Sequence, residues 1–277
     1  MAGAEIACDE SGYEGEKLIG TTTDVFAHGS VRLTVEAAAG CMRELRERIQ
    51  SPATEYKANH ILREKHRAAL EWTLGPLGPL CGHGHVFLID KEHYVRRKLA
   101  DALGADVTAV RDLAAANDLM RARYNGGDVV DAFYASAPAL AATRPRAEAF
   151  RIWLRDQPPG TSYLDPLVPA IARAVARWSA DGPVTVVHDR TNTLRPERLA
   201  AIRAQIGAPL AALRLTDSFT DPRVQAADLL AGAARRIAED ARHDRPDPAL
   251  TELLRPYVDA RSVWGDARTW ALIGPSA

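Results

Sequence analysis

The chain has 277 residues, of which 47% are hydrophobic, and its 35 Lys and Arg against 36 Asp and Glu give a formal net charge of -1. This is the composition of a globular protein, and the charge balance excludes a polybasic protein whose whole surface binds nucleic acid, while a local basic groove stays compatible with it. Because no apolar run approaches the roughly 20 residues needed to cross a bilayer and the N-terminus lacks a signal-peptide pattern, we expect a cytoplasmic protein without membrane contact.

The first part of the chain predicts two strands and then a capped helix. Residues 4–9 (AEIACD) favour a strand that ends at Asp9, and a second extended segment covers about 24–33. Thr34 can cap a helix whose apolar positions recur every three or four residues up to Ile49, before Pro52. A helix over about 59–74, a Gly/Pro loop, a buried strand over 85–90 and a helix through 103 follow.

The rest of the chain predicts a long helical segment and then a return to strands. The pattern from about 104 to 180 is almost wholly helical, which indicates an insertion or subdomain within a single domain of 1–277. VTVVHD (184–189) is typical of a central strand, and a helix over 196–206 and a strand around 213–217 follow it. Asp221 as N-cap and Pro222 begin the last strong helix, before a C-terminal extension of about 243–277. This order predicts an α/β fold with a mixed sheet flanked by helices.

Several polar residues lie where a sheet-based active site is expected. Asp9 and Asp189 each end an apolar strand, and ligands of open α/β sheets bind outside the carboxyl ends of the strands. Asp228 stands among small and apolar residues in AADLLAG, on the same helix face as Gln225 and Gly232. Gly232 would let a neighbouring backbone or a ligand come close to this face.

Glu55, in the segment EYK between two helices, completes a set of four carboxylates. Ionised carboxylates in one partly buried site repel one another, and a divalent cation is the usual counter-charge. Two Mg²⁺ or Mn²⁺ ions about 4 Å apart support phosphodiester cleavage by activating water and stabilising the leaving oxygen. The alternatives are structural: a turn aspartate at Asp9, a local ion pair at Asp189 and a paired buried charge at Asp228.

Three motifs resemble the bacterial domain-of-unknown-function 3800 family, and they are DESG at 9–12, EYK at 55–57 and QAADLLAG at 225–232. The resemblance covers about residues 4–240. It implies a ribonuclease H-like fold and a nuclease activity. The long helical segment over 104–180 is a departure from the plainest form of that fold.

The resemblance also implies roles for individual residues. Asp9 would be the central metal ligand on the first strand, and Asp228 a ligand of the second metal on the final helix. Asp189 and Glu55 would fill the remaining positions. Glu10 and Gln225 belong to the family motifs, without a role that the resemblance assigns.

Basic residues near these acids are candidates for binding nucleic acid. Arg190 and Arg195, together with Arg198 and Arg203, could form a basic rim for a nucleic-acid backbone, although Arg-rich helix surfaces are common in Ala/Arg-rich sequences. Lys57 would contact a phosphate or balance the acids, with a surface salt bridge as the alternative. The Glu-x-Lys spacing also resembles that of restriction-type nucleases, but here it follows a helix and not a strand.

Three further features have weaker functional interpretations. CGHGH at 81–85 alternates ligand-type residues, which suits either zinc or a Gly loop, and no partner pair for a zinc site is present elsewhere. His188 could assist proton transfer, but it should point to the opposite sheet face from Asp189, as a core histidine would. Asp217, at the end of the strand around 213–217, is a secondary candidate carboxylate.

These observations predict a divalent-metal-dependent nuclease that hydrolyses phosphodiester bonds with two Mg²⁺ or Mn²⁺ ions. The alternative is a non-catalytic protein of the same fold that binds nucleic acid or a protein partner in a defence or mobile-element context. The sequence leaves open the choice between RNA and DNA, the mode of cleavage and the oligomeric state.

Overall fold

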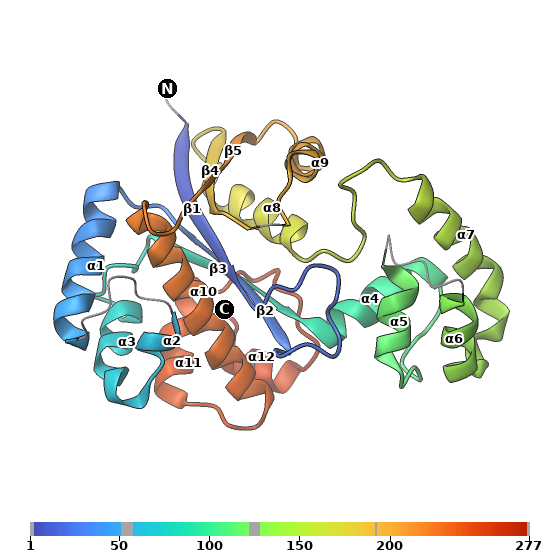
Figure 1. The fold of residues 1–277 in the computed structure, drawn as a ribbon. Coiled ribbons are helices and arrows are strands. Elements are labelled where there is room, and N and C mark those ends of the chain that lie inside the picture. Colours follow the sequence, from blue (N-terminus) through green and yellow to red (C-terminus); the bar gives the residue numbers. More distant parts are fainter. Residues whose placement is uncertain (1–2, 51–57, 122–127, 192, 276–277) are drawn as a thin grey trace.

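A five-stranded mixed sheet forms the centre of the protein in a computed structural model, which describes residues 3–50, 58–121, 128–191 and 193–275. The strands are β1 (Ala4–Ser11), β2 (Val25–Val31), β3 (Gly84–Asp90), β4 (Val184–Asp189) and β5 (Leu210–Thr216), in the spatial order β3-β2-β1-β4-β5. β2 runs antiparallel to β1 and β3, whereas β4 is parallel to β1 and β5. The carboxyl ends of β1, β4 and β5 therefore meet at one edge of the sheet (Figure 1).

Helices flank this sheet, so the predicted α/β class is confirmed. They are α1 (Val35–Ile49), α2 (Ala58–Ile61), α3 (Arg67–Leu74), α4 (Lys91–Leu103), α5 (Leu113–Met120), α6 (Val129–Ser136), α7 (Arg144–Asp156), α8 (Leu167–Trp178), α9 (Pro196–Ile206), α10 (Pro222–Arg242), α11 (Pro248–Leu254) and α12 (Ala267–Ile273). Three short 3₁₀ turns complete the described elements, at Glu64–His66, Pro138–Thr143 and Arg255–Tyr257.

The capped helices begin where the sequence predicts. Thr34 accepts a hydrogen bond from the backbone N–H of Ala37 at the start of α1, and Asp221 accepts one from Arg223 at the start of α10. In both cases the side-chain oxygen satisfies an N–H that has no partner inside the helix. The strand expected around 213–217 begins three residues earlier and ends at Thr216, so Asp217 follows it.

The continuous helix predicted over 59–74 is wrong. Arg63 adopts an extended backbone, with φ -73° and ψ 140°, which separates α2 from a 3₁₀ turn and α3. Ile61 and Leu70 explain the break, because nine residues of straight helix would place them on opposite faces. With the break, both side chains are buried in the same apolar core.

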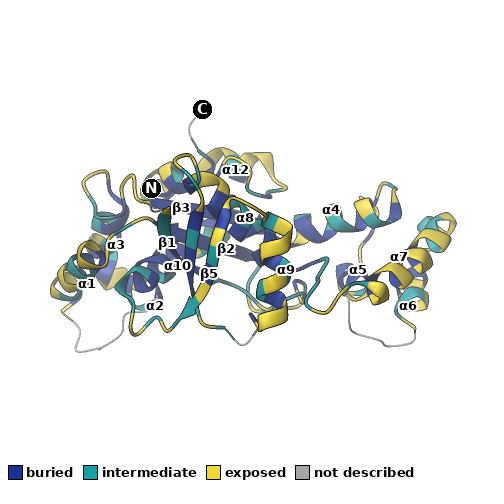
Figure 2. Cartoon of the chain, turned by 90° about the horizontal axis from the view of Figure 1, so that it is seen from above, coloured by how far each residue is buried: buried dark blue, intermediate teal, exposed yellow. Residues whose placement is uncertain are grey.

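Two apolar cores cover the two faces of the sheet, since successive strand residues point to opposite sides. Helix α10 lies directly on one face (Figures 1 and 2). Gly29 on β2 makes this close packing possible, because a Cβ at that position would lie 2.7 Å from the carbonyl oxygen of Ala227 on α10. Helix α8 packs on the opposite face.

The segment predicted as a helical insertion over 104–180 divides into two parts. Helices α5 and α7 pack on α4, and α6 packs on both of them, so that the three form a lobe beside the sheet, whereas α8 belongs to the layer that covers the sheet (Figure 1). In the segment 243–277, α11 and α12 pack next to α10, and Val258 and Val263 form single parallel bridges to β3. Among the described residues, no helix combines the length and the apolar character that a membrane span requires.

Candidate active site

Asp9 lies near the carboxyl end of β1 on the face that α10 covers. Its side chain is only 7% exposed, and its Oδ1 accepts a hydrogen bond of 2.7 Å from the N–H of Glu10. Burial raises the pKa of Asp9 to about 9, and the charges of Glu10, Asp228 and Asp189 add to this rise. Three acids from β1, β4 and α10 therefore act on one buried carboxyl group.

Asp228 faces β1 from the first half of α10. The backbone N–H of Ala58 donates a hydrogen bond of 3.2 Å to its Oδ2, so the start of α2 closes over this carboxylate. Gly232, one turn later, makes room for that approach, because a Cβ there would lie 2.0 Å from the Cβ of Ala58. The close approach expected at Gly232 is thus made by the chain itself.

Asp189 ends β4 next to Asp9. Its Oδ1 accepts a hydrogen bond of 3.0 Å from the N–H of Ser218, in the loop that follows β5. Gln225 holds the same loop from α10, since its Nε2 donates a hydrogen bond of 2.9 Å to the carbonyl oxygen of Ser218. Gln225 is buried, and it positions Asp189 through Ser218, a residue whose N–H binds Asp189 and whose carbonyl oxygen binds Gln225.

Glu10 points to the other face of the sheet, where it meets two buried histidines. Its Oε2 lies 3.4 Å from Nε2 of His188, and the ring of His188 stacks on that of His28 with centroids 5.4 Å apart. Nδ1 of His188 lies 3.0 Å from the carbonyl oxygen of Asp189, which can only accept a hydrogen bond, so we place the ring proton on Nδ1. Burial raises the pKa of Glu10 to about 8, and the charges of Asp189 and Asp165 add to this effect.

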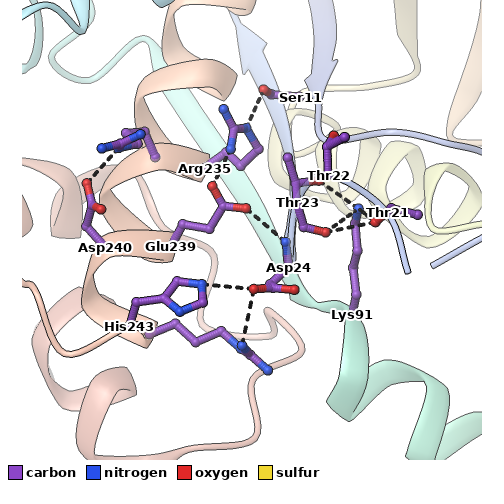
Figure 3. Close-up of polar contacts among 12 residues, drawn as sticks. Ser11, Thr21, Thr22, Thr23, Asp24, Lys91, Arg235, Glu239, Asp240 and His243 are labelled. Atoms are coloured by element: carbon purple, nitrogen blue, oxygen red, sulfur yellow. Dashed lines mark hydrogen bonds and ion pairs between the residues drawn. The ribbon is translucent and has the colours of Figure 1, made fainter. Parts of the chain in front are cut away.

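The second half of α10 is fixed to the ends of β1 and β2 by polar contacts (Figure 3). Arg235 donates a hydrogen bond of 2.9 Å to the hydroxyl of Ser11, and Glu239 accepts one of 2.9 Å from the N–H of Asp24. On the far side of Asp24, buried Lys91 donates to the hydroxyl and carbonyl oxygens of Thr23. These contacts hold α10 in register with β1, which sets the position of Asp228 relative to Asp9.

The basic residues divide into exposed and buried ones. Arg190 and Arg195 are exposed, and neither forms an ion pair with any residue that the structure describes. Arg198 does not belong to a basic rim, because it is buried, donates to the carbonyl oxygen of Gly160 and forms an ion pair with Asp165.

Of the remaining candidate residues, one is exposed on a loop and two lie outside the described residues. Asp217 is exposed, and its Oδ1 accepts a hydrogen bond of 3.0 Å from the N–H of Phe219 within the loop after β5. Glu55 and Lys57 lie outside the described residues, and so does Pro52. Asp165 and Ser218 were not predicted, because each acts through a contact with a residue about 30 positions away in the chain.

His85 of the CGHGH segment is a structural residue of the sheet. It lies on β3, and its Nε2 is 2.8 Å from Oδ2 of Asp259, which also binds Arg173 at 2.9 Å. Cys81 is exposed on the preceding loop. The Gly-loop interpretation fits this arrangement better than zinc binding does, because His85 is already engaged by a carboxylate that an arginine neutralises.

Carboxylates are the ligands that hard divalent cations prefer, and Asp9, Asp189 and Asp228 supply them from three different elements. Burial and the charges of Asp189 and Asp228 raise the pKa of Asp9, so a cation beside this carboxyl group would relieve the repulsion. Over the described ranges, however, no three His, Cys, Asp or Glu side chains lie close enough together to hold one ion. The donor chemistry therefore fits a divalent cation, and the side chains would have to move closer together to bind it.

We compared the chain with models of protein families, with curated proteins and with solved structures. The chain matches no family model, no curated protein and no solved structure. The resemblance to the domain-of-unknown-function 3800 family therefore depends on the three sequence motifs alone.

Proposed function

We propose that the protein is a divalent-metal-dependent nuclease with a ribonuclease H-like arrangement of its sheet and acids. The observation that carries the proposal is that Asp9, Asp189 and Asp228 come from the neighbouring elements β1, β4 and α10, where burial and the charges of Asp189 and Asp228 raise the pKa of Asp9. The resemblance assigns metal ligands to the first strand, the later strand and the final helix, and the structure has acids at these places. Glu55 is proposed as the fourth carboxylate from the motif alone.

Asp9, Asp189 and Asp228 would hold Mg²⁺ or Mn²⁺. Bound there, the ions would supply Lewis acidity toward the phosphate and activate a water molecule. The chain would contribute the orientation of the carboxylates: Ser218 fixes Asp189, and the N–H of Ala58 fixes Asp228. Burial of Asp9 reduces its contact with water, which strengthens its interaction with any charge placed beside it.

Arg190 and Arg195 would bind the phosphate backbone of the nucleic acid. Each follows β4 closely in sequence and is exposed without an ion-pair partner among the described residues. An unpaired guanidinium is available for a bidentate contact with a phosphate, whereas a paired one would first have to leave its carboxylate.

The test is a cleavage assay in Mn²⁺ or Mg²⁺ on single-stranded, duplex and hybrid nucleic acids, with wild type, Asp9→Asn and Glu47→Gln purified in the same way. Glu47 is an exposed carboxylate on α1, so its variant controls for the loss of one negative charge. We expect cleavage by wild type and Glu47→Gln and a loss of at least about 100-fold in Asp9→Asn, as removal of a main charge-stabilising group costs in other enzymes. Equal rates in all three proteins would refute the proposal, and binding without cleavage would favour the non-catalytic alternative.

A further inference from the structure

Phe219 has a large apolar side chain that is exposed to solvent, and it lies on a turn that is stabilised by hydrogen bonds. It is 64% exposed, in the loop between β5 and α10. Its N–H donates to Oδ1 of Asp217 at 3.0 Å, and the hydroxyl of Thr220 donates to the carbonyl oxygen of Asp217 at 2.8 Å. The backbone that carries the ring is thus fixed, while most of the residue is exposed to solvent.

The same turn is part of the candidate active site. Ser218, the residue before Phe219, donates its N–H to Asp189, and its carbonyl oxygen accepts a hydrogen bond from Gln225. Since β4 and β5 are parallel, their carboxyl ends bring Asp189 and this turn to the same edge of the sheet. Phe219 therefore directly follows the residue whose N–H binds Asp189, one of the proposed metal ligands.

Two arginines follow Asp189 in the sequence, and one of them lines a groove. Arg190 and Arg195 are exposed, and no described residue forms an ion pair with either of them. Arg195 also lines a groove of about 660 Å³ together with Tyr13 and Thr193. Arg190 directly follows Asp189, and Phe219 follows Ser218, whose N–H binds Asp189, so a cationic and an aromatic residue both lie next to the contacts of this acid.

An aromatic ring next to phosphate-binding cations is the combination that recognises unpaired bases. Bases in a duplex are stacked on their neighbours, whereas the face of an unpaired base is free to stack on a side chain. We propose that Phe219 stacks on an unpaired base next to the cleaved phosphate, so that the preferred substrate is a single-stranded nucleic acid. This inference rests on the proposed nuclease function and names its substrate class.

The experiment is fluorescence anisotropy with labelled 20-nucleotide single strands of DNA and of RNA and with the corresponding duplexes, in Ca²⁺ and with gels to check for cleavage. Phe219→Ala is expected to weaken single-strand binding about 5- to 150-fold, the range that base–aromatic stacking gives, and to change duplex binding by less than about 2-fold. Phe219→Trp should retain binding, whereas Phe219→Leu, which keeps an apolar side chain without an aromatic face, should resemble Phe219→Ala. Leu77→Ala is the matched control, because Leu77 is 98% exposed in a different loop.

Equal single-strand affinity of Phe219→Ala and wild type, or equal weakening by Leu77→Ala, would overturn the inference. So would a change in self-association with no change in nucleic-acid binding, which would make Phe219 a protein contact. Cleavage in Mn²⁺ is measured separately on the same strands. If the wild type binds single strands through Phe219 but cleaves none of them, only the proposed nuclease function is refuted. If the protein cleaves single strands and Phe219→Ala cleaves them at the same rate, only the proposed stacking is refuted.

Discussion

Replacing Asp9 by Asn should change how stability depends on pH. The pKa of Asp9 is raised from 3.8 to about 9 in the folded protein, so the folded state binds one more proton than the unfolded state across this range. The free energy of unfolding therefore falls as pH rises, by about 1.4 kcal/mol per pH unit for this group. Asn stays neutral at every pH and removes this loss, while its Oδ1 can still accept the hydrogen bond from Glu10.

The assay is thermal unfolding of wild type and Asp9→Asn in EDTA at pH 5 and pH 7, with Glu47→Gln as control. Two pH units correspond to about 3 kcal/mol, so the difference in Tm between Asp9→Asn and wild type should shift in favour of the variant by about 5–10 °C. Adding Mn²⁺ at pH 7 should stabilise wild type by binding to the folded state and should stabilise Asp9→Asn less. Parallel pH profiles of wild type and Asp9→Asn would show that Asp9 is ionised in the folded protein, and the argument for crowded acids would fail.

Two other substitutions test the packing and the orientation of the site. Gly29→Ala should destabilise the protein by about 1–3 kcal/mol, because the new Cβ would meet the carbonyl oxygen of Ala227. The control is Gly40→Ala in helix α1, which should stabilise the protein by up to about 1 kcal/mol because alanine favours a helix more than glycine does. Urea unfolding midpoints measure both changes. Gln225→Leu should lower kcat by about 10- to 100-fold with KM nearly unchanged, because Ser218, whose N–H holds Asp189, loses the hydrogen bond to its carbonyl oxygen, and a change in KM alone would contradict this role.

Local patterns in the sequence were sufficient for most elements of the fold. Thr34 and Asp221 mark helix starts through their own side chains, and the apolar segments that contain Asp9 and Asp189 predict the strands that end near them. The error over 59–74 has a tertiary cause. That segment has helical character throughout, but its apolar residues reach one core only if the helix breaks at Arg63.

The sequence predicted site residues only where the polarity of a side chain differs from that of its neighbours in the chain. Asp228 among Ala and Leu is such a conflict, and the structure couples it to Asp9. Ser218 acts through a backbone N–H that every residue but proline has, so its identity carries no signal. Asp165 and His85 depend on partners that are 33 and 174 residues away, which no local pattern reveals.

The charge balance of the sequence underestimates how positive the folded protein is near the site. Burial and neighbouring acids raise the pKa values of Asp9 and Glu10, so these two groups carry less negative charge than the formal count assigns to them. Many other arginines are paired with carboxylates, whereas Arg190 and Arg195 have no ion-pair partner among the described residues and follow Asp189 closely in the chain. A phosphate that approaches this edge would therefore meet unpaired guanidinium groups around partly neutralised acids, which is why near-neutral composition is compatible with a nucleic-acid substrate.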